Sequence, residues 1–189
     1  MLKIATHDSA TGEKSKGFIS WLVTPFAKTQ SKTIKDQYNA GCRSFDIRVK
    51  YINNTWYCAH GLWKSKRTAL DILDELNSLG DTVQVCVTYE GNEENEDIFK
   101  HFGIICQIKY TNIIFGAFCI KYTGEVKFPK VAYREVLYAN PSYGGADANF
   151  IKLDGRNWHT YIPIPWLWNF IYTRKHEFNE DRYTSVDFL

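Results

Sequence analysis

The stretch Ser44-Phe45-Asp46-Ile47-Arg48-Val49 alternates apolar with polar or charged side chains, which is the pattern of a β-strand. Successive side chains of a strand point to opposite faces, so Phe45, Ile47 and Val49 share one face and Asp46 and Arg48 share the other. We expect helices to cover the apolar face. Asp46 and Arg48 then point into the interior of a barrel, where charged side chains serve a site. The alternative is an ion pair on the strand surface, which would contribute little energy.

Apolar runs and amphipathic segments alternate along most of the chain. This order predicts parallel strands joined by helical crossovers, and therefore an α/β fold. The length of 189 residues fits one domain over 1–189. We predict helices over 30–40, over 69–79 with Thr68 as the N-cap, and from the polar loop 91–95 to about 107. Strands are predicted at 43–51, 56–59 (after a turn at Asn53-Asn54), 82–89, 112–120, 135–139, 150–153 and 184–189.

Composition narrows the class of protein further. A net charge of +2 without a long Lys/Arg block gives no case for a nucleic-acid partner. The short clusters 14–16 and 64–67 are expected to be solvated, and they would favour an anionic surface weakly. Five cysteines without CxxC spacing predict buried free thiols and a reducing compartment. With no run of ~18 apolar residues, we expect a cytoplasmic or peripheral membrane protein, secreted only if a leader was removed.

Two histidines accompany this strand in the sequence. His7 follows the first apolar run, and His60 ends the run 56–59. Imidazole gives and takes protons near neutral pH, and with the guanidinium of Arg48 the two histidines would supply the base, acid and cation of a phosphodiester cleavage. Glu90 ends the strand 82–89, so we expect these side chains at matching strand ends, where a barrel carries its chemistry. Three other histidines are expected to be structural or surface residues: His101, His159 and His176.

The segments 5–9, 40–48 and 59–61, with Thr29-Gln30 and Gln37, resemble the X domain of bacterial-type phosphatidylinositol-specific phospholipase C. The resemblance is specific over residues 1–61 and weaker beyond. It implies a small, distorted or incompletely closed TIM barrel. It also implies a monomeric, metal-independent phosphodiesterase without cofactor. Its partners would be phosphatidylinositol-type lipids or other phosphodiesters and a transient membrane surface.

The resemblance implies a role for each candidate residue. His7 is the general base that takes the proton from the inositol 2-hydroxyl as this attacks phosphorus. His60 is the general acid that protonates the diacylglycerol oxygen. Arg48 stabilises charge on the phosphate in place of a calcium ion. The remaining implied roles are the orientation of His7 by Asp187 and the tuning of His60 and Arg48 by Asp46 and Asp8.

Two departures from the family pattern concern the headgroup. The family's lysine late in the fourth strand is missing from 87–90, and its later arginine is missing from 138–141. Residues at these positions, namely Glu90, Tyr89 and Asn140, are assigned to substrate binding. The chain is also shorter than the ~250 residues typical of a TIM barrel.

The irregular apolar segment 161–172 contains Trp166 and Trp168. Tryptophan favours the headgroup layer of a membrane, so these two residues are our interfacial candidates. The equally weighted alternative is a loop packed across the barrel.

Two other functions stay open. One is a metal-dependent glycerophosphodiesterase or sphingomyelinase-D-like barrel with Glu90 and Asp46 among its ligands, against which Arg48 argues as a resident cation. The other is a barrel that binds lipid or phosphate without turnover.

Overall fold

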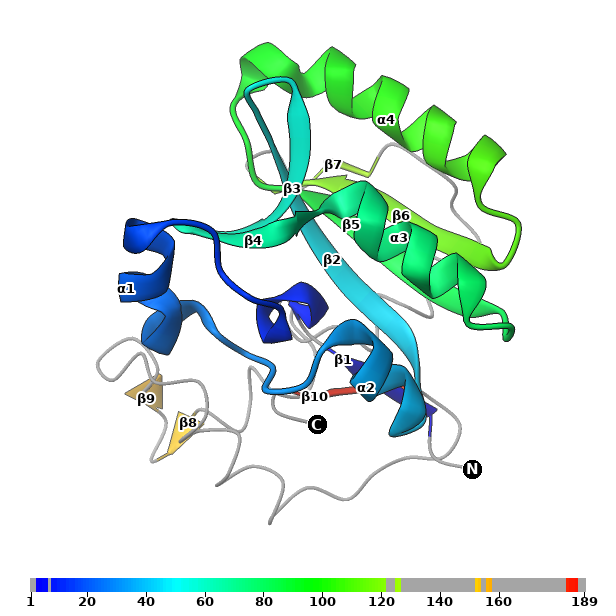
Figure 1. Cartoon of the computed structure of the whole chain (residues 1–189), viewed down its shortest axis with the longest axis horizontal. Coiled ribbons are helices and arrows are strands. Elements are labelled where there is room, and N and C mark those ends of the chain that lie inside the picture. Colours follow the sequence, from blue (N-terminus) through cyan, green and yellow to red (C-terminus); the bar gives the residue numbers. More distant parts are fainter. Residues whose placement is uncertain are drawn as a thin grey trace.

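The computed structural model describes residues 3–6, 8–121, 125–126, 152–153, 156–157 and 183–186 (Figure 1). Five parallel strands form the main sheet in the order β10-β1-β2-β5-β6. Their bounds are β1 (Lys3–Thr6), β2 (Cys42–Ile52), β5 (Val83–Tyr89), β6 (Ile113–Ile120) and β10 (Tyr183–Val186). The helices are α1 (Phe18–Ala27), α2 (Ile34–Asn39), α3 (Ala69–Ser78) and α4 (Glu96–Lys109), with short 3-10 turns at Ser9–Gly12 and Glu93–Asn95.

The predicted α/β class is confirmed, and the sheet is open over the described residues. Its main path ends at β10 on one side and at the short antiparallel strand β7 (Glu125–Val126) on the other, and a hairpin branches from β2. A separate two-stranded sheet joins β8 (Lys152–Leu153) to β9 (Arg156–Asn157). The distorted barrel therefore stays a prediction. The expected strand 135–139 lies outside the described residues.

His60 ends a strand as predicted, but this strand is not one of the parallel strands expected from the order of elements. The strand β3 (Thr55–His60) runs antiparallel to β2, with Val49 opposite Cys58, and continues into β4 (Trp63–Thr68). Asn53 and Asn54 both have left-handed backbone angles, φ +48° and +58°. Two such residues make a tight hairpin turn, which sends the chain back along β2. His60 reaches the level of the middle of β2 because β3 runs in reverse.

Local capping explains where two helices begin. Thr33 Oγ1 accepts a hydrogen bond from the amide of Asp36, so α2 starts at Ile34 and is shorter than the predicted helix over 30–40. The amides of Thr29 and Gln30 instead donate to Thr11 Oγ1 at 3.0 and 3.1 Å. The cap predicted at Thr68 is confirmed as a complete capping box.

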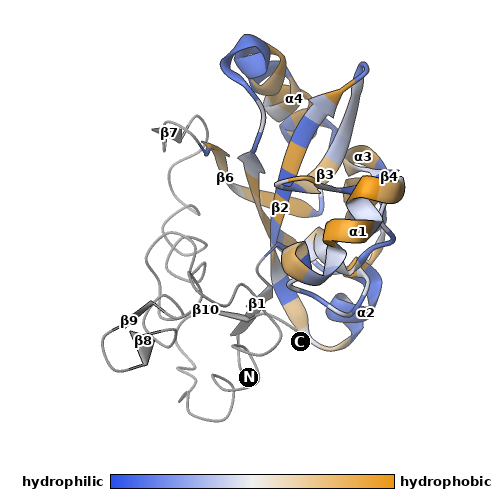
Figure 2. Cartoon of the chain, turned by 90° about the vertical axis from the view of Figure 1, so that its left-hand side faces the viewer, coloured by the Kyte–Doolittle hydropathy of each residue, from blue (hydrophilic) through white to orange (hydrophobic). Residues whose placement is uncertain are grey.

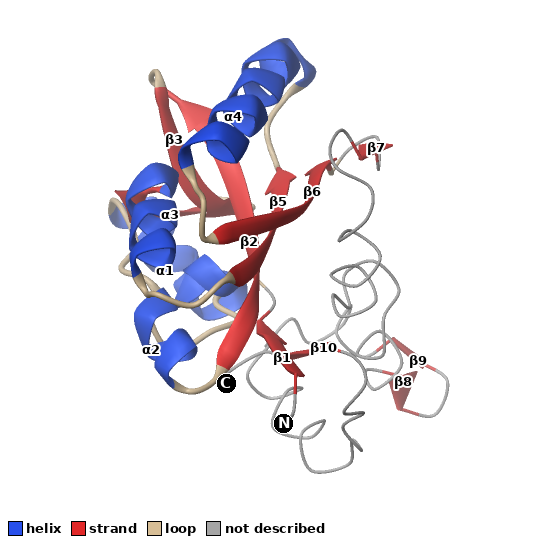
Figure 3. Cartoon of the chain, turned by 90° about the vertical axis from the view of Figure 1, so that its right-hand side faces the viewer, coloured by secondary structure: helices blue, strands red, loops and turns tan. Residues whose placement is uncertain are grey.

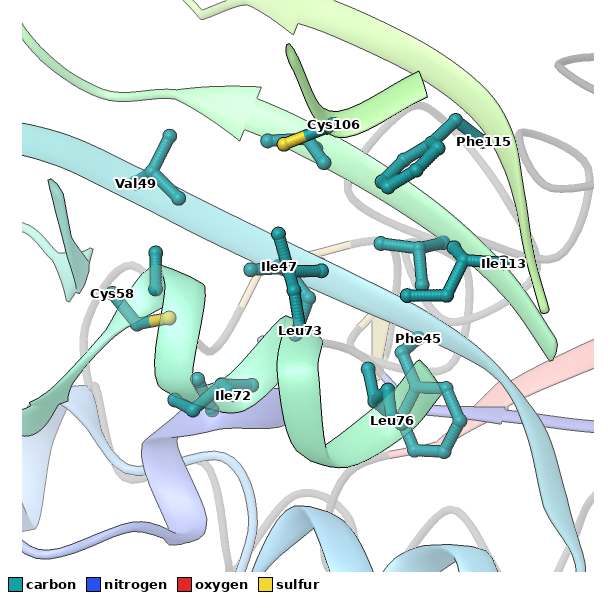
Figure 4. Packing of buried hydrophobic residues seen from close by; sticks show 14 of the residues in the cluster. Phe45, Ile47, Val49, Cys58, Ile72, Leu73, Leu76, Cys106, Ile113 and Phe115 are labelled. Atoms are coloured by element: carbon teal, nitrogen blue, oxygen red, sulfur yellow. The ribbon is translucent and has the colours of Figure 1, made fainter. Parts of the chain in front are cut away.

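The hydrophobic core lies between the sheet and the helices, which cover one face of β2, β5 and β6 (Figure 3). Phe45, Ile47 and Val49 are fully buried on this face, as their alternation predicts. Figure 4 shows Leu73 and Leu76 of α3 packed over them. Burial of side chains of this size stabilises the fold by about 1.5–3 kcal/mol each. The same packing directs the alternate residues of β2 away from the helices.

Candidate active site

Arg48 is surrounded by three carboxylates on the face of β2 opposite the core. Its Nε contacts Asp8 Oδ1 and lies 3.2 Å from Asp46 Oδ2, while its Nη1 lies 3.1 Å from Glu90 Oε1. The Arg48 side chain is 8% exposed, and those of Asp8, Asp46 and Glu90 are 1–3% exposed. We call these four residues the Arg48 cluster. A surface ion pair is excluded, because both partners on β2 are buried.

The loop after β1 places Asp8 in the Arg48 cluster. Asp8 has left-handed backbone angles, φ +44° and ψ +48°, which aspartate tolerates better than most residues. Its amide donates to Asp46 Oδ2 at 3.2 Å. Ser9 Oγ accepts from the amide of Asp46 at 2.9 Å and donates to Thr6 O at 2.8 Å. The motif of residues 5–9 is thereby tied directly to β2.

Glu90 enters from the end of β5, next to β2 in the sheet. The Glu90 amide donates to Val49 O at 2.9 Å, which holds the residue beside β2. Glu90 Oε1 is shared between Arg48 and Lys121, whose Nζ lies 2.6 Å away, and Oε2 accepts from the amide of Gly61 at 2.9 Å. Lys121 follows β6, the next strand of the sheet. Glu90 therefore links β2, the ends of β5 and β6, and the loop after His60.

His60 lies beside the cluster and is 26% exposed. Its Nδ1 is 2.7 Å from Ala27 O and 3.3 Å from Asp8 Oδ2. A carbonyl oxygen only accepts hydrogen bonds, so Nδ1 carries a proton. The remaining ring nitrogen, Nε2, is then the atom that gains or loses a proton. The two contacts orient the imidazole, which is the requirement for a general acid or base.

The buried charges stabilise one another. Burial opposes a charged guanidinium, but Asp8, Asp46 and Glu90 outweigh it and raise the pKa of Arg48 well above its ordinary value. Burial also opposes the charged form of Glu90 and so raises its pKa. The Arg48 charge and the hydrogen bonds from Lys121 and the Gly61 amide outweigh this effect and lower the Glu90 pKa to about 2. The carboxylate of Glu90 thus pairs with two basic side chains, Arg48 and Lys121, whereas Asp8 and Asp46 pair with Arg48.

Six of the proposed site residues lie in the described part of the chain. The structure brings five of them together and places the sixth, Tyr89, elsewhere. Asp8, Asp46, Arg48, His60 and Glu90 converge as described above. Tyr89 lies on the opposite face of β5 and is fully buried, because adjacent residues of a strand alternate in direction. Its ring stacks on Phe99 at 5.1 Å between centroids, and its hydroxyl donates to Asn92 O. Tyr89 therefore belongs to the core and does not contact the Arg48 cluster.

Five other proposed residues lie outside the described part of the chain: His7, Asp187, Asn140, Trp166 and Trp168. Their roles remain predictions.

Sequence reasoning missed two features near the site. The first is Lys121, which supplies a cation at Glu90 from the following strand. The signal was its position directly after the apolar run 113–120. The second is α1, whose large apolar side chains face solvent: Phe18, Trp21 and Phe26 are 73, 63 and 59% exposed. Figure 2 shows the strongly hydrophobic colouring of this helix.

No group of three or more His, Cys, Asp or Glu side chains in the described part of the chain is arranged to hold a metal ion. Asp8, Asp46 and Glu90 direct their oxygens to the Arg48 guanidinium instead. None of the described helices is both long and apolar enough to cross a membrane.

The described residues thus define a mixed α/β structure with a buried guanidinium–carboxylate cluster and an adjacent histidine. No protein-family model and no curated protein matches the chain. Among solved structures, a phosphatidylinositol-specific phospholipase C of Staphylococcus aureus is similar, with 23% identity over 59% of this chain and 38% of that one and a TM-score of 0.43. The Listeria monocytogenes enzyme has 22% identity over 55% of this chain and 40% of that one and a TM-score of 0.38. The chain thus spans well under half of these proteins, and the functional conclusion rests on the residues of the site.

Proposed function

We propose that the chain is a metal-independent phosphodiesterase that cleaves phosphatidylinositol-type lipids. The observation that supports this proposal most strongly is the meeting of three separate segments at one place: Asp8 and Arg48 lie in the buried cluster, and His60 contacts Asp8 beside it. These residues belong to the motifs in which the sequence resembles phosphatidylinositol-specific phospholipase C. An oriented histidine beside a buried guanidinium supplies an acid–base group and a cation for a phosphate.

In the proposed reaction, the inositol 2-hydroxyl attacks the phosphorus of the same molecule. His7 takes the hydroxyl proton, and His60 gives a proton from Nε2 to the departing diacylglycerol oxygen. The products are an inositol cyclic phosphate and diacylglycerol. Holding nucleophile and phosphorus in one molecule removes much of the entropic barrier.

Arg48 stabilises the negative charge that develops on the phosphate oxygens. Asp8 and Asp46 hold the guanidinium in place, and Asp8 also contacts Nδ1 of His60. The two aspartates therefore act by positioning the cation and the acid. The family pattern has a lysine at the position of residues 87–90, at the end of β5, and this chain lacks it. Lys121, which pairs with Glu90 at the exposed side of the cluster, supplies a cation in its place.

Turnover tests this proposal directly. Phosphatidylinositol vesicles are incubated with the full chain in the presence of EDTA, and the phosphorus products are followed by ³¹P NMR. We expect an inositol cyclic phosphate, and we expect its formation to be abolished in His7→Ala and His60→Ala. His101→Ala is the matched control, because His101 is exposed on α4 and its Nδ1 lies 2.8 Å from Asp97 O of its own helix.

Two outcomes contradict the proposal. Activity that disappears with EDTA would favour the metal-dependent alternative, with Asp46 and Glu90 as ligands. A folded chain that binds lipid vesicles but turns over no phosphodiester would favour the non-catalytic alternative.

A further inference from the structure

A groove of about 530 Å³ lies between the beginning of α1 and the β3–β4 hairpin. Its walls combine three lysines with exposed apolar side chains, and none of the described residues that line it is acidic. The lysines are Lys16, Lys50 and Lys64, each from a different segment. Cavities of this volume are large enough for a small organic ligand. We call this feature the lysine groove.

Within the described residues, none of the three lysines forms an ion pair with a carboxylate. Lys16 Nζ contacts the Tyr57 hydroxyl and lies 4.0 Å from the ring centroid, and Lys50 Nζ donates to Gly61 O at 2.6 Å. These partners are neutral. The ion pairs found in this part of the chain include none of the three lysines. The groove is therefore positively charged, and its complement is an anion.

The rim of the groove is apolar and faces solvent. Phe18 and Leu62 are each 73% exposed, and Ile19 is 64% exposed. An ordinary surface helix buries its large apolar side chains. In α1 the buried residues are instead the small ones, Ser20 and Ala27. Ser20 Oγ fixes this orientation by accepting from the amide of Lys64 and donating to its carbonyl, both at 2.9 Å. The groove thus has an apolar rim and a positively charged interior. This arrangement is complementary to an anionic lipid, which carries an apolar tail and a negatively charged headgroup.

One residue separates the lysine groove from the candidate active site. Gly61 lines the groove, its carbonyl accepts from Lys50, and its amide donates to Glu90 of the Arg48 cluster. Gly61 directly follows His60 and has φ +60°, a conformation that favours glycine. A molecule seated in the groove thus lies beside the catalytic histidine without occupying its site.

We propose that the lysine groove binds the headgroup of one anionic phospholipid that is not the substrate, while Phe18, Ile19 and Leu62 enter the bilayer. This lipid anchors the chain with the rim beside His60 against the membrane. The inference extends the proposed action on lipids, but it concerns binding only. It is therefore tested with a lipid that has no inositol.

The experiment measures sedimentation of the full chain with phosphatidylcholine vesicles, with and without phosphatidylglycerol. The groove variant is Lys16→Gln/Lys50→Gln/Lys64→Gln. A control variant, Lys35→Gln/Lys100→Gln/Lys109→Gln, loses the same net charge from α2 and α4. We expect phosphatidylglycerol-dependent binding by the wild type, a roughly 100-fold loss in the groove variant, and a change of only a few-fold in the control.

A second variant tests the apolar rim with the lysines intact. Phe18→Ser/Leu62→Ser removes two exposed side chains, so we expect an unchanged circular dichroism spectrum and a loss of vesicle binding of at least about 10-fold. Absence of binding by the wild type overturns the inference. So does equal binding by the groove and control variants, which would mean diffuse attraction by net charge. Absent turnover of phosphatidylinositol leaves all of these results interpretable.

Discussion

Removal of the Arg48 charge is the most direct perturbation of the candidate site. In Arg48→Gln, three carboxylates that are 1–3% exposed lose their shared cation. Breaking a buried ion pair by removing one partner costs about 3–5 kcal/mol, because the remaining charge stays buried. A domain of this size is stable by about 5–15 kcal/mol. We therefore expect Arg48→Gln to fold but to lose about 3–5 kcal/mol in unfolding free energy at neutral pH.

The pH dependence separates charge from packing. Without the guanidinium, the buried carboxylates take up protons more readily, and protonation relieves their repulsion. The stability difference between wild type and Arg48→Gln should therefore shrink as the pH falls from about 7 to about 5. Urea unfolding followed by tryptophan fluorescence at several pH values measures it.

Arg43→Gln is the matched control on the same strand. Arg43 pairs with Asp81 at 2.9 Å, but Asp81 is 60% exposed, so this substitution should cost less than about 1 kcal/mol. The reasoning is refuted if Arg48→Gln costs no more than Arg43→Gln, or if its cost is the same at every pH.

Four further predictions concern separate features. Lys121→Gln should raise the KM for phosphatidylinositol more than it lowers kcat, which steady-state kinetics would reveal; equal effects on both would place Lys121 in the chemical step. Because the Glu90 pKa is lowered from 4.5 to about 2 in the folded chain, its carboxylate stabilises the fold above about pH 4.5. That contribution is lost as the pH falls toward 2, so Glu90→Gln should reduce the acid dependence of the unfolding free energy by about 3 kcal/mol, as chemical denaturation at each pH would show. Thr68→Ala removes the capping box of α3 and should cost about 1 kcal/mol in urea unfolding; no measurable cost would contradict the capping argument. Trp166→Ala/Trp168→Ala should weaken vesicle binding with the fold intact, whereas unchanged binding by the folded variant would remove these residues from the membrane surface.

Much of the fold is readable from local pattern. The alternation through Phe45, Ile47 and Val49 predicts which face of β2 is buried, since the side-chain period of a strand is two. Thr68 marks the start of α3 because its hydroxyl satisfies an amide that the first helical turn leaves unpaired. Asn53 and Asn54 predict a turn, but they do not predict the direction of the strand that follows them.

The site is harder to predict from the sequence, because its charged residues lie far apart along the chain. Residues 7–9, 46–48 and 60 carry recognisable motifs, and the structure brings the described ones together. Glu90 and Lys121 have no such pattern. Their pairing depends on the parallel register of β5 with β6, in which Tyr89 lies opposite Ile120. Tyr89 is next to Glu90 in the sequence but is not part of the site, because its ring packs in the core on the opposite face of β5.

The sequence alone determined that a buried strand presents Asp46 and Arg48 to the face opposite a helix-covered core, because strand alternation is a property of neighbouring residues. It also determined which motif residues accompany them. Only the tertiary structure decided that Glu90 completes the surroundings of Arg48, and that His60 lies on a strand antiparallel to β2. It alone decided that α1 turns its apolar side chains outward beside three lysines. These features depend on strand order, register and chain reversal, which are set by packing between distant segments and leave no local period in the sequence.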